Sequence, residues 1–305
     1  MKFGKLPNIA NIDFKLPAQD PQTMRFLAQQ AKPTSLPQIY IGCTGWSMKE
    51  WVGKVYPEKT KAKDYLKAYS KQFNTIEFNT THYRIPSLDN IDKWKTESSP
   101  DFRFCPKILQ AISHRNDLGL VSGQLLAFCD VIQGLEEKLG CCFMQLPPYF
   151  GYDRFTMLKQ FIQAFPSDIP LAIELRHESW FNNPAHTTAI FDLLEANNIG
   201  TVITDVAGRR DVLHTRLTTN MAMIRFVGND LHPTDYERID EWVQRLKTWI
   251  DAGLSTVYFF THEPDNINAP EMAKYLYEQI TEACKVISKG PSIPPEDPTA
   301  QISLF

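Results

Sequence analysis

The 305-residue sequence has no run of about 18 apolar residues, the length that a helix needs to cross a bilayer. Its first residues, "MKFGKLPNIANIDFKLP", contain no apolar stretch of the kind that forms the core of a secretory signal peptide. These two absences predict a protein that has no membrane partner and that stays in the cytoplasm.

The chain also lacks a strong excess of charge of either sign, because its formal net charge is −3. A broad basic surface that holds nucleic acid through its phosphates is therefore not expected. The 43% hydrophobic and 22% charged residues are ordinary for a globular protein. This composition is still compatible with a local basic pocket.

Sequence signatures of metal sites are missing as well. The six cysteines never occur as C-x-x-C, which predicts buried thiols in place of a disulfide or zinc framework. The seven histidines form neither H-x-x-x-H nor H-E-x-x-H, so a zinc site is not indicated. No cofactor is predicted, and a divalent metal held by carboxylates stays open as an alternative.

Short apolar runs alternate with longer amphipathic segments after residue 37. The runs are rich in β-branched and aromatic residues, and Gly, Pro, Asn or Asp bounds most of them, which is typical of buried parallel strands. We predict strands at 39–46, 75–81, 102–108, 141–148, 171–177, 199–205, 221–228 and 256–263.

The segments between these runs predict helices. The clearest covers 235–253, where apolar residues recur at i, i+3, i+4 and i+7 and Gly253 is placed to end the helix. Further helices are predicted at 61–72, 122–138, 154–164, 186–197 and 269–288.

Eight strands that alternate with helices predict an α/β fold, a (β/α)8 TIM barrel. The barrel would be a single domain at residues 38–288, with an N-terminal extension at 1–37 and a flexible tail at 289–305. A doubly wound open sheet is the alternative, but the first turn, "GCTGWS", lacks the pattern G-x-G-x-x-G.

Polar residues lie near the ends of the apolar runs, where barrel enzymes place their chemistry. In the second run, Glu77, Asn79 and Thr81 alternate and are expected on one face of the strand. Tyr83 and Arg84 follow in the loop. The other candidates at strand ends are Trp46, Lys107, Gln145, Glu174, Arg176, His177, Trp180, Asp205, Arg225 and His262.

Three of these candidates are cations, Lys107, Arg176 and Arg225, and together they predict an anionic ligand group such as phosphate or carboxylate. Glu77 and Glu174 are the carboxylates best suited to general acid–base catalysis or to a divalent metal. The competing interpretation is a structural ion-pair network. Convergence of so many polar groups on one rim favours a ligand site.

His177 and His262 are candidate ligands or proton shuttles, and Lys107 is also a candidate Schiff-base nucleophile. Trp46 and Tyr83 could wall the site or stack on a base or sugar, or they could simply pack at the mouth of the barrel. The residues to which we assign catalysis are Glu77, Lys107, Glu174 and His177.

Six stretches carry a resemblance to a known family: "GCTGWSMKEWVGKVYP", "FNTIEFNTTHYRIPS", "FRFCPKILQAISH", "MQLPP", "IELRHESW" and "IRFVG". In combination they closely resemble the YecE-like family, catalogued as domain of unknown function number seventy-two. The resemblance covers about residues 39–285 and implies a TIM barrel distantly similar to the xylose isomerase and AP endonuclease superfamily. It implies no settled reaction.

The polar motif positions of that family add His114 to the candidate substrate-binding residues. One departure lies at the last strand, where many members have "YFNN" and this chain has "YFFTHEPDN", so that His262 and Asp265 occupy a variable part of the site. The full histidine and carboxylate set of the AP endonucleases is not evident. Inheritance of their multi-zinc chemistry is therefore not expected.

The last five residues, "QISLF", resemble the motif that binds the bacterial DNA sliding clamp. They follow a Pro-rich spacer, and the Gln amide with the apolar Leu and Phe could fill a groove on the clamp. The alternative is a tail that folds back on its own barrel. The residues predicted to bind this partner are Gln301, Ile302, Ser303, Leu304 and Phe305.

Three functions stay open at this point. The first is an enzyme of nucleic-acid maintenance that acts on a phosphate-containing ligand. The second is a small-molecule isomerase, lyase or hydrolase of a phosphorylated or carboxylated sugar-like substrate. The third is a non-catalytic module that recruits a partner to the clamp.

Overall fold

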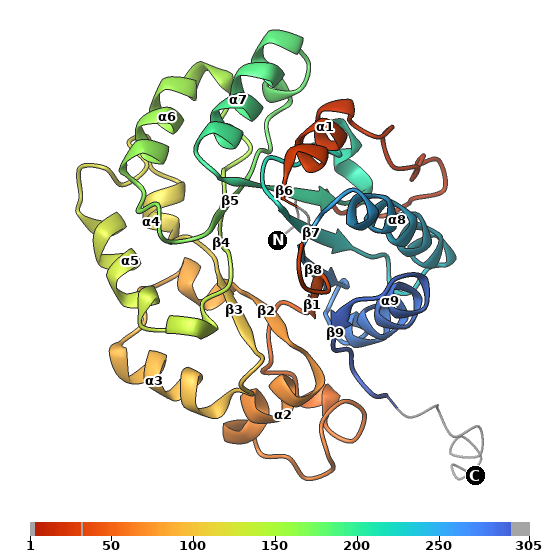
Figure 1. Cartoon of the computed structure of the whole chain (residues 1–305). Helices are drawn as coiled ribbons and strands as arrows, with labels where there is room; N and C mark the ends of the chain where they lie inside the picture. The colour runs from red at the N-terminus through yellow and green to blue at the C-terminus, as the bar shows by residue number, and fades with distance from the viewer. Residues whose placement is uncertain (1–3, 32, 294–305) are drawn as a thin grey trace.

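The structure, a computed structural model, describes residues 4–31 and 33–293. Strands and helices alternate along the chain from residue 38 (Figure 1). Every predicted apolar run forms a strand, although each is shorter than predicted. The strands are β1 Gln38–Gly42, β2 Thr75–Phe78, β3 Arg103–Pro106, β4 Cys142–Gln145, β5 Leu171–Glu174, β6 Gly200–Asp205, β7 Met221–Val227 and β8 Thr256–His262.

These strands form two parallel sheets. The larger sheet has seven strands in the order β4-β5-β6-β7-β8-β1-β9, where β9 is the short strand Ile287–Ser288. The smaller sheet pairs β2 with β3. In Figure 1 the strands surround a common centre in chain order, and helices lie outside them. The carboxyl ends of parallel strands therefore meet on one face of the molecule.

Among the described residues, isolated backbone contacts and side-chain hydrogen bonds join the two sheets in place of a continuous strand ladder. The Glu77 N–H donates to the Cys43 carbonyl at 3.0 Å, and the Gly140 N–H donates to the Phe104 carbonyl at 2.7 Å. The Asn74 side chain also bonds two backbone groups of β1, at 2.8 and 2.9 Å. The fold is thus a mixed α/β fold with parallel strands. The predicted closed barrel is not confirmed, because the strand pairing is interrupted between β1 and β2 and between β3 and β4.

The predicted helices are present, and the structure adds three that were not predicted. The predicted ones are α2 Tyr65–Gln72, α5 Gln124–Gln133, α6 Phe155–Ala164, α7 Pro184–Ala196, α8 Pro233–Asp251 and α9 Ala269–Ala283. The added ones are α1 Pro21–Gln29, α3 Leu88–Glu97 and α4 Gln110–Ser113. No helix in the described part of the chain is long and apolar enough to cross a membrane.

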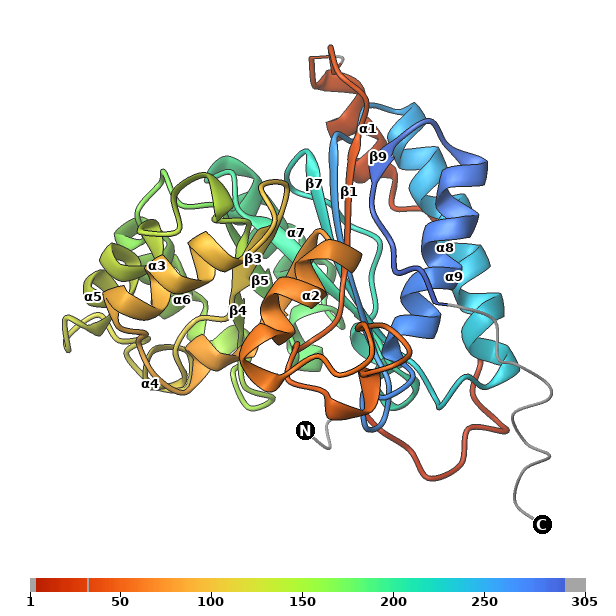
Figure 2. The ribbon, with the colours of Figure 1, turned by 90° about the horizontal axis from the view of Figure 1, so that it is seen from below.

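The bounds of α8 show how the local sequence sets this helix. Pro233 occupies the first turn, and a capping box joins His232 to Asp235, whose carboxylate accepts the His232 N–H at 3.0 Å. Gly253 adopts a φ of +118° just beyond the last turn, as the predicted stop requires. Figure 2 shows α8 beside α9, on the side of the molecule opposite to α3, α5 and α6.

Apolar side chains fill the space that the strands enclose. A buried cluster draws residues from β3 to β8, and its members include Phe143, Met223, Tyr258 and Phe260. The Phe143 ring lies 5.8 Å from the Lys107 Nζ and 5.7 Å from the Arg225 guanidinium carbon. The cluster thus forms an apolar floor under the polar residues at the carboxyl ends of the strands. All six cysteines are free thiols, and five of them are buried as predicted, whereas Cys284 is partly exposed.

Residues 14–29 of the N-terminal extension pack outside the strands near β6 and α8 (Figure 1). Asp20 caps α1 by accepting the Gln22 N–H at 2.7 Å. The buried Thr23 hydroxyl donates to the Thr215 carbonyl at 2.9 Å, and the Trp249 Nε1–H donates to the Gln19 Oε1 at 2.8 Å. Residues 14–29 are therefore tied to the folded core by specific hydrogen bonds.

Candidate functional site

A cavity of about 280 Å³ opens at the carboxyl ends of the strands. Each strand from β1 to β8 contributes a lining residue at or just after its end: Thr44, Glu77, Lys107, Gln145, Glu174, Thr204, Arg225 and His262. The remaining lining residues are Lys5, Asn79, Tyr83, Arg176, Val227, Glu263, Pro264 and Asn266. Parallel pairing thus brings residues from distant parts of the sequence to one place.

Arg225 lies at the centre of this site between two buried carboxylates. Its Nε and Nη2 donate to the two oxygens of Glu77 at 2.8 and 2.9 Å, and its Nη1 donates to the Glu174 Oε2 at 2.8 Å. Glu77 is 0% exposed and Glu174 is 2% exposed. The guanidinium therefore spends three of its five N–H donors on the protein, and it holds both carboxylates in fixed positions.

The network extends from this centre along neighbouring strands. The His262 Nε2 lies 2.8 Å from the Glu77 Oε2, and the Asn79 Nδ2 donates to the other oxygen at 2.9 Å. The Gln145 Nε2 donates to the Glu174 Oε2 at 2.7 Å, and its Oε1 accepts from the Lys107 Nζ at 3.0 Å. The structural ion-pair network considered from the sequence is thus present, and it lines a cavity.

These contacts set the charge of the two glutamates. Burial raises the pKa of the Glu77 carboxyl, but the nearby Arg225 and His262 outweigh burial and hold this pKa well below its usual value. For Glu174, burial likewise acts against Arg225 and Arg176, and the net pKa is lowered. Both glutamates are therefore ionised at neutral pH.

Burial also lowers the pKa values of two cations at the site, Lys107 and Arg176. Burial and the neighbouring Arg225 lower the pKa of Lys107 to about 8, although Glu77 and Glu174 act to raise it. Lys107 is 1% exposed. Burial also lowers the pKa of Arg176 to about 10, and the Arg176 Nε lies 3.7 Å from the Glu174 Oε1. Lys107 thus has a protonation equilibrium near physiological pH, which suits proton transfer as well as anion binding.

Four residues that line the cavity each carry a buried side-chain oxygen with no hydrogen-bond partner among the described residues. These oxygens are the Glu174 Oε1, the Thr204 Oγ1, the Glu263 Oε1 and the Asn266 Oδ1. A buried polar atom without a partner costs free energy, so a cluster of such atoms around one space indicates a missing donor. Residues with unsatisfied oxygens and cationic residues therefore surround the same cavity.

Glu263 was not singled out from the sequence, although it follows His262 directly. It is 2% exposed, and its Oε2 accepts the Asp230 N–H at 2.8 Å. Burial and the nearby Asp235 raise the pKa of Glu263 to about 7. A Cβ atom at Gly228 would overlap the Glu263 carboxylate, so the glycine of the motif "IRFVG" makes room for this side chain.

Several residues predicted for the site lie outside the cavity lining. Trp46 stacks on Phe78 with ring centroids 5.2 Å apart and packs against the core. The Trp180 Nε1–H donates to the Phe150 carbonyl at 2.8 Å, and the ring is fully buried. Arg84 is exposed on the surface. Trp46 thus takes the packing role that was its alternative interpretation.

The two histidines near this region make local contacts. The His177 Nδ1 lies 2.8 Å from the Ser179 Oγ and caps a short 3-10 helix, Glu178–Trp180. The His114 Nδ1 lies 2.9 Å from the Ser113 Oγ. Burial and the nearby Lys107 and Arg176 lower the pKa of His114. The His114 ring therefore lies close enough to the site to interact electrostatically with these two cations.

The expected common face of Glu77, Asn79 and Thr81 was wrong for Thr81. Strand β2 ends at Phe78, and Asn79–His82 form a 3-10 turn, so strand alternation stops before Thr81. The Thr81 hydroxyl turns back and donates to the Lys107 carbonyl at 2.8 Å. It fixes the backbone beside the site instead of facing the cavity.

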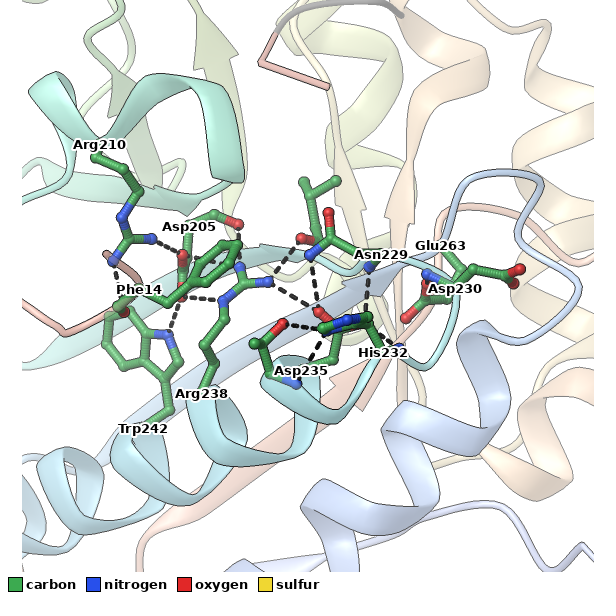
Figure 3. A network of polar contacts seen from close by, with 12 residues as sticks. Phe14, Asp205, Arg210, Asn229, Asp230, His232, Asp235, Arg238, Trp242 and Glu263 are labelled. Carbon is green, nitrogen blue, oxygen red and sulfur yellow. Dashed lines mark hydrogen bonds and ion pairs between the residues drawn. The ribbon is translucent and has the colours of Figure 1, made fainter. Parts of the chain in front are cut away.

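The placement of Asp205 at the rim was also wrong. Strand residues alternate between two faces, and Thr204 lines the cavity while Asp205 points toward α8 (Figure 3). Asp205 is 0% exposed and forms ion pairs with Arg210 and with Arg238, the latter at 2.8 Å. Its Oδ2 also accepts the Trp242 Nε1–H at 2.8 Å. Asp205 therefore joins β6 to the outer helix.

Metal binding would need a group of at least three suitable ligands. In residues 4–31 and 33–293, no group of three His, Cys, Asp or Glu side chains is arranged to hold a metal ion. Glu77 and Glu174, the carboxylates considered for a divalent metal, both bond Arg225.

Some lining residues could have been found from the sequence and others could not. Thr44 and Thr204 lie at strand ends, so the rule that selected the larger polar residues applies to them too. Glu263 follows a strand in the same way. Lys5 carries no such signal, because it belongs to the N-terminal extension and reaches the cavity only through the tertiary fold.

Comparisons with known proteins agree with this architecture. The family model described as "Protein of unknown function DUF72" matches residues 40–298. The UPF0759 protein YecE of Escherichia coli K12 is 30% identical over 285 aligned residues, which cover 88% of this chain and 100% of that protein. The UPF0759 protein YunF of Bacillus subtilis is 31% identical over 153 residues, 48% of this chain and 53% of that protein.

A solved structure shares the fold. The crystal structure of a DUF72 family protein from Enterococcus faecalis V583 matches with a TM-score of 0.66 and 20% identity, over 80% of this chain and 98% of that one. The family model extends over most of the chain and includes every lining residue except Lys5. The chain therefore belongs to the DUF72 family of proteins of unknown function.

Proposed function

We propose that this protein is an enzyme that performs acid–base chemistry on a small polar substrate with both an anionic group and hydroxyl groups. The observation that carries the proposal is a cavity that brings the cations Lys107 and Arg176 together with residues whose buried oxygens have no hydrogen-bond partner among the described residues. The oxygens call for hydrogen-bond donors, and the cations call for an anion. A sugar acid or a sugar phosphate supplies both.

The charge of the site supports an anionic group. Lys107, Arg176 and Arg225 carry three positive charges, and Glu77 and Glu174 carry two negative ones. One positive charge is left over while Glu263 is protonated. Arg225 donates three of its N–H groups to the two carboxylates. We therefore assign binding of the anion to Lys107 and Arg176.

We assign proton transfer in this proposal to Glu263 and Lys107. Glu263 lines the cavity, its Oε1 has no hydrogen-bond partner among the described residues, and burial and the nearby Asp235 bring the pKa of Glu263 to about 7. A group with such a pKa can give up or accept a proton at neutral pH. Glu77 and Arg225 act as positioning residues, because they hold each other and the neighbouring Glu174.

The size of the cavity favours a small molecule over a nucleic-acid duplex. A space of about 280 Å³ accepts a monosaccharide derivative or one extruded nucleotide, but no double helix. The interpretation as a nucleic-acid maintenance enzyme gains no separate support from the site. We also propose that β1 to β8 form one (β/α)8 barrel whose pairing is locally loosened beside β2 and β3.

Replacing Lys107 with Met is expected to weaken ligand binding about a hundredfold, the usual scale for removing a buried charge from a charged contact. Isothermal titration calorimetry can measure this with glucose 6-phosphate and gluconate, beside glycerol and inorganic phosphate as partial ligands. Only the first two offer an anion and several hydroxyls, so they should bind more tightly than either partial ligand.

The pH dependence gives a second readout. Lys107 holds an anion only when protonated, and the pKa of Lys107 is about 8, so affinity should fall by up to about tenfold per pH unit above pH 8. Lys93→Met, on the exposed face of α3, is the matched control. Equal binding by Lys107→Met and the native chain, or no binding by any of the four probes, would contradict the proposed function.

For the tail we propose, from the sequence alone, that "QISLF" binds the bacterial sliding clamp. Residues 301–305 lie outside the described part of the chain. Saturable micromolar binding of a labelled 287–305 peptide to a clamp, lost on Leu304→Ala and Phe305→Ala, is the expected result in fluorescence anisotropy. Unsaturable binding, or binding that survives both substitutions, would remove the partner and with it the link to DNA.

A further inference from the structure

One lining residue of the cavity comes from outside the family domain. Lys5 belongs to the N-terminal extension, which precedes the first residue of the family match at position 40. Its Nζ donates to the Pro264 carbonyl at 2.9 Å, in the loop after β8 that also carries Glu263 and Asn266. The extension therefore crosses the mouth of the site.

We propose that residues 4–13, here called the flap, cover the cavity and that Lys5 is a ligand-binding residue supplied by this flap. This inference rests on the proposed function in so far as Lys5 would contact the same anionic substrate. The cover itself does not depend on the identity of the ligand.

The flap is clasped to the core at a pair of glycines. The Gly208 N–H donates to the Gly4 carbonyl at 2.8 Å. A Cβ atom on Gly208 would lie 2.8 Å from that oxygen and 3.2 Å from the Gly4 Cα, which is too close. Gly4 has a φ of +76°, a conformation that other residues rarely adopt. Glycine at both positions is what permits this close approach.

The attachment of the flap is light compared with that of the residues that follow it. Among the described residues, the Gly4 carbonyl and the Lys5 ammonium make the only hydrogen bonds between the flap and the chain beyond residue 15. By contrast, the Phe14 carbonyl accepts from Arg210 at 2.7 Å, and the Leu16 N–H donates to Glu241 at 2.9 Å. The firm anchor thus begins at Phe14, where a hinge would lie.

A cavity beneath the flap also indicates that the flap is weakly attached to the core. A second cavity of about 250 Å³ separates the flap from the loop after β7. It is lined on one side by Gly4, Lys5, Leu6, Pro7 and Ile9, and on the other by Val206, Val227, Gly228, Asn229, Asp230, His232 and Pro264. A segment that is poorly packed and held at one clasp can open without disturbing the core.

The chemistry of Lys5 matches the ligand that the cavity calls for. The described contact of its ammonium is with a neutral backbone carbonyl, which leaves two further N–H donors. Lys107 and Arg176 lie deeper in the same cavity. A closed flap therefore adds a third cation for an anionic group and restricts the access of water to the site.

The first test compares full-length variants in calorimetric titrations with glucose 6-phosphate. Lys5→Met should weaken binding about fivefold, the scale of one partly exposed ionic contact. Lys15→Met, just beyond the hinge and outside the cavity lining, should bind like the native chain. If Lys107→Met abolishes binding and Lys5→Met leaves it unchanged, the role of Lys5 is overturned while the proposed function stands.

The second test needs no ligand and examines the cover. Trinitrobenzenesulfonate is a bulky reagent that labels neutral amines, and peptide mass spectrometry reports its rate at Lys107. Gly208→Ala forces the clasp apart and should raise labelling of Lys107 about tenfold, with no change at the exposed Lys93. Equal rates at Lys107 in Gly208→Ala and the native chain would rule out the flap as a cover, whatever the substrate is.

Discussion

Arg225→Met is expected to lower the free energy of unfolding by about 3–5 kcal/mol, because it leaves two buried carboxylates without their shared cation. Glu77 and Glu174 both bond the Arg225 guanidinium, and both are nearly inaccessible to water. Met has a similar length, so contact with the Phe143 ring is largely kept. Urea unfolding followed by circular dichroism at pH 7 measures the difference.

The same substitution should reverse the effect of mild acid. In the native chain the pKa values of Glu77 and Glu174 are lowered by folding, so these groups stabilise the fold at neutral pH, and that stability is lost as the pH falls through the lowered values. Without Arg225, burial is the leading influence and raises both pKa values. The variant should therefore become more stable between pH 7 and pH 5, while the native chain should not.

Arg115→Met provides the control, since Arg115 pairs with Asp117 on the surface. This change should leave the unfolding curve unaltered at both pH values. An Arg225→Met variant as stable as the native chain, or one with the native response to acid, would show that the two carboxylates do not depend on Arg225.

Asp205→Ala is expected to cost about 3–5 kcal/mol of unfolding free energy and to leave ligand binding intact. Asp205 is the shared acceptor of Arg238, Arg210 and the Trp242 indole, and its loss leaves the buried Arg238 with Asp235 as its remaining carboxylate (Figure 3). The Arg238 guanidinium also lies 4.1 Å from the Phe226 ring centroid, so its position is tightly packed.

Thermal unfolding and calorimetry on the same sample separate the two roles of Asp205. Asp205→Asn keeps the volume of the side chain and should fall between Ala and the native chain in stability. If Asp205→Ala has normal stability but no longer binds glucose 6-phosphate, Asp205 is a ligand-binding residue of the cavity. This result would contradict its placement toward α8.

Much of the fold was predictable because its signals are local. Strands buried on both faces appear as continuous apolar runs, and all eight runs became strands. The same burial explains the error at Asp205. Alternation along a strand places Thr204 and Asp205 on opposite faces. Because both faces of the strand are covered, the sequence does not show which of the two residues faces the cavity. At Thr81 the strand pattern continued in the sequence after the backbone had turned at Phe78.

The candidate residues of the site were predictable from their place at strand ends, but their partners were not. Glu77 and Arg225 are 148 residues apart, and only the ring of strands brings them to 2.8 Å. The lowered pKa of Lys107 likewise depends on burial and on Arg225, neither of which the sequence around "FCPKI" shows. Lys5 is the extreme case, since no local pattern ties it to the cavity.

The clasped N-terminal extension also bears on how the chain folds. Its anchor points are separated from their partners by about 190–230 residues, for example Thr23 from Thr215 and Gln19 from Trp249. During synthesis these residues leave the ribosome long before their partners, on α8 and in the segment between β6 and β7, exist. Such distant contacts carry a high entropic cost of loop closure and form late. This early segment therefore docks late, and the cavity stays uncovered until nearly the whole chain has folded.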